Sequence, residues 1–281
     1  MKKALIFLVF YIFMLWVFMG IITMLLPPPW PLIGNNINSY SFLIMILDLF
    51  IILFVYFVLK IFDKKPLAGY FTMPSAGIAL LSVIGLLLLN NVVNIAIELV
   101  KVPINISANI FEALKTPISI ATICVIAPIA SELTFRRGIL GSLLESKKFH
   151  KYALIISTVF FAIVATTPVQ VVSSFFIGLF FGWLYIRTNS LVLPLLGNII
   201  YNTVNILPLF FFDPIHTFRD MLGSTAMMLI VLAASAILLV PVVLVLNRKL
   251  PHCTQPVKED VEPYDEITSV LDDEAESNNP D

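Results

Sequence analysis

One carboxylate and two guanidinium groups lie close together in the apolar stretch APIASELTFRRGIL, residues 127–140. Glu132 precedes Arg136 by four residues, so in a helix the two side chains lie one turn apart and can form an ion pair. An ionisable residue within a membrane helix is costly enough to suggest a function. Two interpretations are open. Glu132 acts as a base, or it only pairs with Arg136 while Arg136 and Arg137 anchor the helix at the inner face.

Asparagines form a second polar group further along the chain. Asn198, Asn202 and Asn205 follow i, i+4, i+7 spacing and therefore share one side of a helix. Their amides could line a cavity that faces Glu132 and binds a peptide or a lipid. Alternatively, they hydrogen-bond across helices as packing residues, worth roughly 0.6 to 2 kcal/mol each. We interpret Asn205 as a packing residue and keep Asn198 and Asn202 as site candidates.

A lone carboxylate, Asp48, lies in another apolar stretch. We predict that it pairs with Asn90, Asn91 or Asn94 of the following apolar segment, because an unpaired charge in a membrane is costly. An ion or proton path is the alternative, and it would need more charged residues than these segments hold. The sequence therefore favours structural pairing of Asp48.

The composition indicates that these polar and charged residues lie on membrane helices. The 281 residues are 59% hydrophobic and only 12% charged, against roughly 25% charged residues in a soluble domain. We predict an all-α fold, a polytopic membrane helical bundle of about eight transmembrane helices, each near the 20 residues that a spanning helix needs. The predicted spans are 4–26, 42–59, 76–98, 117–135, 152–166, 169–186, 191–212 and 225–246. The pair within 152–186 forms either two full spans or a shallow hairpin.

The distribution of basic residues predicts the orientation, because cytoplasmic loops retain Lys and Arg. With the N-terminus inside, fourteen basic residues fall on inner loops and ends. Only Lys101, Lys115 and Arg219 fall on outer loops. We therefore predict that the N-terminus and the C-terminus are both cytoplasmic.

The chain divides into four predicted regions. N-terminal transmembrane helices occupy 1–116, a membrane core 117–212, a last transmembrane helix 213–250 and a tail 251–281. The stretch KEDVEPYDEITSVLDDEAESNNPD in this tail carries ten acidic residues and one lysine, so we expect disorder. The tail either solvates the chain end or docks a basic cytosolic partner.

The sequence lacks the motifs of several classes of function. It contains no glycine-rich phosphate loop and no nucleic-acid module, so we expect no nucleic-acid partner. The two cysteines, Cys124 and Cys253, have no zinc-ligand spacing and are expected in a reducing compartment.

Two stretches of the core carry a family resemblance. The stretch SELTFRRG, residues 131–138, resembles the E-E-L-x-F-R-G signature of the CAAX protease and bacteriocin-processing family of intramembrane endopeptidases, the type II CAAX prenyl endopeptidase group. The stretch FFIGLFFGWLYIRTNSLVLPLLGNIIYN, residues 175–202, is similar to that family's G-x-x-x-G-W-x-x-x-x-T-x-S-x-x-x-P region. The matching positions there are Gly178, Gly182, Trp183, Thr188, Ser190 and Pro194. The resemblance covers residues 117 to about 205.

The catalytic positions of that family are only partly kept. Ser131 takes the place of the first glutamate, while Glu132 and Arg136 match the signature. In the F-x-x-x-H motif, Ala165 takes the place of the histidine four residues after Phe161. In the H-x-x-x-N motif, Asn198 replaces the histidine and Asn202 is retained.

The resemblance implies which chemistry is affected. In the family, a glutamate and a histidine activate water, and a histidine and an asparagine stabilise the oxyanion. Alanine supplies no proton acceptor, and an asparagine amide donates a hydrogen bond but is no base at neutral pH. A bound metal ion is disfavoured without the motif histidines, and we expect no cofactor.

These residues lead to a first expectation and two alternatives. We expect a catalytically degenerate family member, a pseudoprotease in the bacterial plasma membrane. It would bind or protect a peptide or membrane-protein partner through Glu132, Arg136, Asn198 and Asn202, as in bacteriocin immunity or envelope regulation. The first alternative is an active endopeptidase with Glu132 and Asn202 as catalytic residues. The second is a transporter of small solutes or ions.

Overall fold

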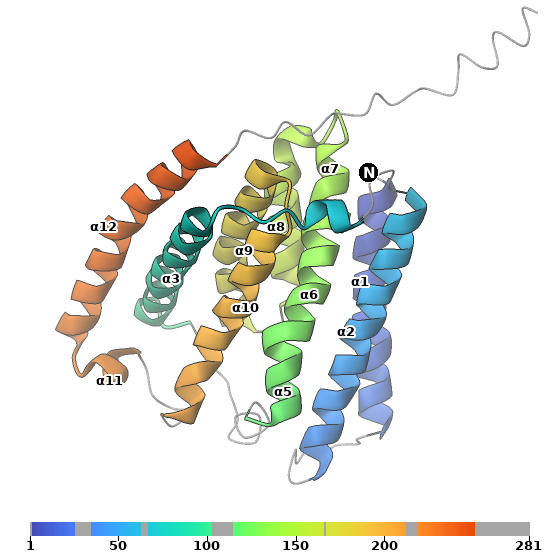
Figure 1. Ribbon diagram of the computed structural model, residues 1–281. Coiled ribbons are helices and arrows are strands. Elements are labelled where there is room, and N and C mark those ends of the chain that lie inside the picture. The colour runs from blue at the N-terminus through green and yellow to red at the C-terminus, as the bar shows by residue number, and fades with distance from the viewer. Residues whose placement is uncertain are drawn as a thin grey trace, which may run out of the picture.

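The computed structural model describes residues 2–25, 35–62, 67–102, 115–165, 167–211 and 218–250, and the regular elements in these ranges are helices (Figure 1). The acidic tail lies outside the described residues. The longest helices are α1 (Lys2–Leu25), α2 (Asn35–Phe62), α3 (Ala76–Leu99), α9 (Pro168–Thr188), α10 (Val192–Ile206) and α12 (Thr225–Lys249). Shorter ones are η1 (Leu67–Tyr70), η4 (His150–Tyr152), α8 (Ala153–Ile163), η5 (Leu207–Phe210) and α11 (Phe218–Leu222).

One long helix between residues 117 and 144 is built from five consecutive segments. They are α5 (Pro117–Ala121), η2 (Thr122–Ile126), α6 (Ala127–Glu132), η3 (Leu133–Leu140) and α7 (Gly141–Leu144), of which η2 and η3 have π-helical geometry. We call this continuous run the central helix. It carries Glu132 and Arg136, and π-helical turns are often found at functional sites.

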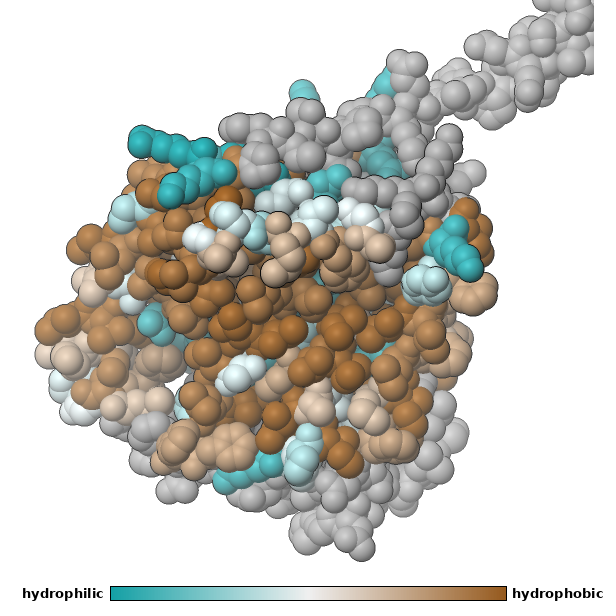
Figure 2. Space-filling model, viewed as in Figure 1, coloured by the Kyte–Doolittle hydropathy of each residue, from teal (hydrophilic) through white to brown (hydrophobic). Residues whose placement is uncertain are grey.

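The polytopic bundle predicted from the sequence is confirmed. In the described residues, five helices are long and apolar enough to cross a membrane, at 41–61, 76–99, 117–144, 168–188 and 225–249. Three shorter apolar helices, at 3–17, 150–163 and 192–206, account for the other predicted segments. Figure 2 shows a broad apolar band across one face of the molecule with more polar residues toward its ends. The chain is a multi-pass membrane protein.

The central helix lies inside the bundle. Helices α1 and α2 pack along one side of it, and α8 and α10 pack against its other segments, while α3 and α12 pair further out beside α9 (Figure 1). One apolar cluster joins α1 and α2 to the central helix through Phe7, Ile51 and Phe135. A second joins α3, α9 and α12 through Leu86, Phe181 and Leu246. The first residues of α1 and the end of α12 lie at the same end of the bundle (Figure 1).

The α8–α9 pair is an antiparallel hairpin with arms of unequal length. Gly178 of α9 lies against Thr158 and Phe161, and Gly182 lies against Leu154, so the G-x-x-x-G pattern serves internal packing as interpreted from the sequence. Helix α8 has 11 residues, or about 16 Å at 1.5 Å per residue, roughly half of a 30 Å hydrocarbon core. The predicted segment 152–166 is therefore not a helix of full spanning length.

The predicted pairing of Asp48 with an asparagine of the next span is wrong. Helix α2 lies on one side of the central helix, and α3 lies on the opposite side of the bundle (Figure 1). Asn90 and Asn94 instead donate to the Asn205 side chain on α10, each at 3.4 Å, and Asn94 also donates to Asn90 at 3.0 Å. Asn205 thus joins α3 to α10, which is the packing role expected of it.

Hydrogen bonds at the α9–α10 turn attach the segment that precedes α3. Asn189 has a left-handed backbone with φ of 49°, and it ends α9. The buried Ser190 hydroxyl donates to the carbonyl of Thr72 at 2.8 Å and accepts from the amide of Val192 at 3.2 Å. Arg187 donates to the carbonyls of Asn247 and Leu250 at the end of α12. The T-x-S part of the family pattern is therefore structural in this chain.

Removal of the Ser190 hydroxyl should destabilise the fold. Ser190→Ala leaves the Thr72 carbonyl without its buried donor, which we expect to lower the free energy of unfolding by about 1–3 kcal/mol. Thr203→Ala is the control, because Thr203 is exposed and bonds only the Ile199 carbonyl of its own helix. Denaturant titration in detergent micelles measures both. Equal stability of the two variants would contradict a structural role for Ser190.

Candidate functional site

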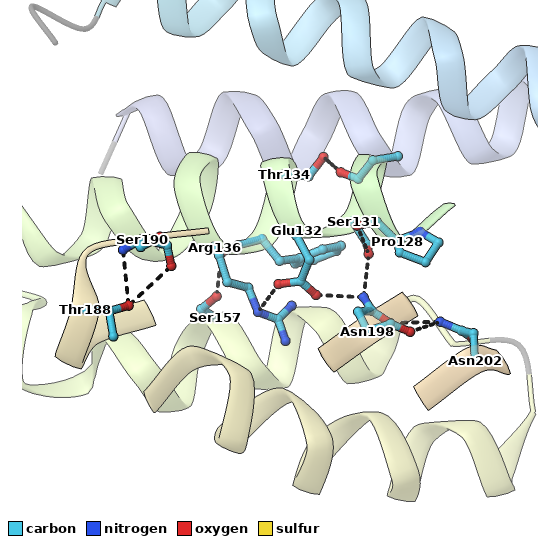
Figure 3. Close-up of polar contacts among 12 residues, drawn as sticks. Pro128, Ser131, Glu132, Thr134, Arg136, Ser157, Thr188, Ser190, Asn198 and Asn202 are labelled. Carbon is cyan, nitrogen blue, oxygen red and sulfur yellow. Dashed lines mark hydrogen bonds and ion pairs between the residues drawn. The ribbon is translucent and has the colours of Figure 1, made fainter. Parts of the chain in front are cut away.

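Glu132 lies at the centre of a buried polar site. The side chain is only 1% exposed, at the junction of α6 and the π-helical segment η3. Its Oε1 accepts a hydrogen bond from Nδ2 of Asn198 at 2.7 Å, and its Oε2 lies 3.0 Å from Nε of Arg136 (Figure 3). The ion pair expected from the i, i+4 spacing is therefore present. Both carboxylate oxygens face a partner within the chain.

Arg136 is buried as a cation between aromatic rings. Its side chain is 2% exposed, and the guanidinium carbon lies 4.4 Å from the ring centre of Phe161 and 5.5 Å from that of Phe181. Such cation–π contacts offset part of the cost of removing the charge from water. Among the described residues, Nη1 and Nη2 find no hydrogen-bond partner.

The interpretation of both arginines as surface anchors is wrong. Arg137 is also only 2% exposed; its guanidinium lies 4.4 Å from the ring centre of Tyr70 and 3.6 Å from the Glu145 carboxylate. Both side chains turn into the bundle, where each meets a carboxylate and an aromatic ring. The sequence predicts the Glu132 partner of Arg136 but not the rings, because these come from distant segments.

The asparagines of α10 extend the site along one line. Asn198 is buried, and its Nδ2 donates to Ser131 Oγ at 3.0 Å as well as to Glu132. Asn202 donates to the side-chain oxygen of Asn198 at 2.8 Å and to its backbone carbonyl at 2.9 Å. The exposed fraction of the side chain increases along α10, from the buried Asn198 to the half-buried Asn202 and the exposed Asn205. The line of amides therefore runs from Glu132 toward the surface of the bundle (Figure 3).

Five of the residues predicted to form the site lie together in the structure. Ser131, Glu132, Arg136, Asn198 and Asn202 form one connected set of contacts. Ala165 follows the end of α8, about one helical turn beyond the Phe161 ring that contacts Arg136. It brings a methyl group and no polar atom to that place.

Sequence reasoning missed two parts of the site. Phe181 contributes a second ring beside Arg136, and the Pro128 carbonyl accepts the Ser131 hydroxyl at 3.1 Å. Pro128 supplies no N–H to the preceding turn of the central helix. A proline four residues before Glu132 is the one signal in the sequence that the helix geometry changes here.

The donor set does not fit a metal ion. The site offers one carboxylate, two amides and a hydroxyl, whereas a zinc site takes three or four His, Cys or carboxylate ligands. Within the described ranges, no three His, Cys, Asp or Glu side chains lie together in a way that could hold a metal. The expectation that the protein uses no cofactor stays a prediction.

Fold and site together define a polytopic membrane protein with a buried polar site around Glu132 and Arg136. A family model described as "Type II CAAX prenyl endopeptidase Rce1-like" matches residues 113–204, the region that holds Glu132, Arg136, Asn198 and Asn202. Residues 113–204 are therefore similar to the type II CAAX prenyl endopeptidases, in the same part of the membrane core where the motifs resemble that family.

A curated relative supports the same family. The chain is 32% identical over 116 residues to a Bacillus subtilis (strain 168) protein named "Putative membrane peptidase YdiL". The alignment covers 41% of this chain and 46% of that relative, so the match spans about half the relative's length. No solved structure matches the chain significantly.

The buried ion pair makes a quantitative prediction. Arg136→Met leaves Glu132 as an uncompensated buried charge, so we expect it to lower the free energy of unfolding by about 3–5 kcal/mol. The double variant Glu132→Gln/Arg136→Met removes both charges and keeps an acceptor for Asn198, so it should regain most of that loss. Denaturant titration of the two single variants and the double variant measures the coupling. A double variant as unstable as Arg136→Met would exclude the ion pair as the cause.

Proposed function

We propose that this chain is a catalytically degenerate member of its family, which binds or protects a peptide or membrane-protein partner instead of cleaving it. The observation that carries this proposal is the state of Glu132. One oxygen accepts from Asn198 and the other faces Arg136, so the carboxylate is occupied within the chain. A general base must instead contact the water that it activates.

The available histidines support the same conclusion. Peptide hydrolysis needs a base for the attacking water and donors for the oxyanion. Of the three histidines, the described residues include His150, whose Nδ1 lies 2.6 Å from the carbonyl of Leu144 near the end of the central helix. His216 and His252 lie outside the described residues. The positions that hold histidine in the family carry Ala165 and Asn198, neither of which is a base.

The line of asparagines supports a binding role. A peptide segment in a membrane must satisfy every backbone donor and acceptor internally or through a partner. Amide side chains supply both a donor and an acceptor, and the Nδ2 group of Asn202 donates to Asn198, which leaves the side-chain oxygen of this half-buried residue as an acceptor. A partner segment that lies along this part of α10 would therefore find an acceptor at Asn202. We propose bacteriocin immunity or envelope regulation in the bacterial plasma membrane as the setting.

An active endopeptidase is the second candidate, and two observations favour it. The relative is named a membrane peptidase. Glu132 and Asn202 are also both linked to Asn198, so a carboxylate and an amide donor lie within one hydrogen-bonded set. Catalysis would require Asn202 to release Asn198 and Glu132 to contact water.

Profiling of protein N-termini separates the two candidates. Membrane and secreted proteins of wild-type, deletion and Glu132→Gln cells would be compared by N-terminal peptide mass spectrometry. We expect no cleavage product that depends on Glu132, because no free base acts there. Glu132→Gln is preferred to alanine since it keeps an acceptor for Asn198. A product lost from both the deletion and the Glu132→Gln cells would establish proteolysis and contradict our proposal.

The same strains test binding. A phenotype of the deletion should be restored by Glu132→Gln but not by Asn202→Leu, which removes the half-buried amide. Thr203→Leu, at the exposed neighbouring position, is the matched control and should restore the phenotype. Membrane levels of each variant are measured by immunoblot, so that loss of protein is distinguished from loss of binding.

A further inference from the structure

A second ionisable group is buried on α2, apart from the site around Glu132. Asp48 is only 7% exposed, and its Oδ2 has no hydrogen-bond partner among the described residues. Its neighbours on the buried side of α2 are Leu47, Ile51 and Val55, which belong to an apolar cluster. A charged carboxylate without a partner in such surroundings is among the most costly groups in a membrane protein.

The elements packed against α2 supply no counter-charge. These elements are α1, η1 and the central helix. Lys2 and Lys3 begin α1 about two turns before Phe10, whose ring stacks on Phe54, six residues past Asp48. These lysines, like Lys60 of α2, therefore lie toward the far end of the α1–α2 pair. The other titratable groups are engaged elsewhere or neutral: Glu132 and Arg136 pair with each other, Arg137 contacts Tyr70 and Glu145, and Cys124 is a buried free thiol.

Hydroxyl groups of α2 and of the start of the central helix are also occupied. Ser41, two turns before Asp48, lies 2.5 Å from the Ser119 hydroxyl, and Ser119 in turn lies 2.8 Å from Thr116. The Thr122 hydroxyl donates to the carbonyl of Ile118 in its own helix at 2.8 Å. Asp48 is thus left as a single buried acidic group whose Oδ2 has no hydrogen-bond partner within the part of the chain that the structure describes.

The single carboxylate of Asp48 suits a proton better than a metal ion. A metal ion of the sodium or calcium type takes several oxygen ligands, and a single carboxylate is too few. A proton needs a single carboxylate oxygen and no cavity. It also converts the carboxylate into a neutral group with an O–H donor, which removes the cost of a buried charge.

We propose that Asp48 is a proton-binding site within the membrane, formed by α2 and α1 and separate from the polar site around Glu132. The bound proton lies on the Asp48 carboxyl, whose Oδ2 has no hydrogen-bond partner in the described ranges. This inference does not depend on whether the chain cleaves, binds or protects a partner.

A series of packed rings crosses from α1, which packs against the Asp48 helix, to the polar site. The ring of Tyr11 meets Phe135 edge to face at 5.1 Å, and Phe135 meets Phe161 in the same way at 5.1 Å. Phe161 in turn contacts the Arg136 guanidinium. Helices α1 and α2 are therefore packed continuously against the residues around Glu132.

Carbodiimide labelling tests the proposal on the full-length protein in membranes. Dicyclohexylcarbodiimide is apolar and reacts with protonated carboxyl groups, so mass spectrometry should find its adduct on the peptide that contains Asp48. The yield should fall several-fold as the pH is raised. Asp48→Asn should lose the adduct, and Ser41→Ala, on the same helix, should keep it. A yield that does not change with pH, or protection by sodium ions at constant pH, would overturn the proton assignment.

Infrared difference spectroscopy gives a second, reagent-free measurement. Wild-type protein should show the carbonyl stretch of a protonated carboxyl group in apolar surroundings, and Asp48→Asn, which has nearly the same shape, should lack it. Glu132→Gln should keep the band, which distinguishes this site from the polar site of the proposed function. Absence of the band from the wild type, or its persistence in Asp48→Asn, would refute the proposal.

Discussion

The buried pair of Glu132 and Arg136 sets the constraints on the rest of the structure. Two charges removed from water are tolerated only when each meets the other and further polar or aromatic groups surround them. Asn198 on α10 supplies a hydrogen bond to the carboxylate, and Phe161 on α8 and Phe181 on α9 lie against the guanidinium. The positions of α8, α9 and α10 around the central helix follow from these contacts.

The residues that depart from the family pattern keep this site polar but neutral. Ser131 and Asn198 still exchange hydrogen bonds with their surroundings, and neither carries a charge. The set around Glu132 therefore balances to zero with Arg136 alone. A second carboxylate at position 131 would have added a negative charge that Arg136 alone does not balance.

Much of this arrangement was predictable from local patterns. The apolar segments, the Glu132–Arg136 pair and the line of asparagines follow from composition and helical spacing, which act within one element. The partner of Asp48 was predicted wrongly, because adjacency in sequence does not determine which helices touch. The burial of Arg137 was missed for the same reason, since Tyr70 comes from a separate short helix. Contacts between distant elements depend on the whole packing.

Helix α8 begins short of the end of α9, and this offset affects the surrounding lipid. Leu154, the second residue of α8, packs against Gly182, six residues before the end of α9, so α8 begins about 7 to 8 Å short of that end at 1.5 Å per residue. Lys151 and Tyr152, exposed just before its start, are residue types that favour the depth of lipid headgroups. A helix shorter than the hydrocarbon core is accommodated by local thinning of the bilayer and by flanking residues that reach the headgroups, so the lipid beside α8 has less hydrocarbon to cover than the lipid beside α9.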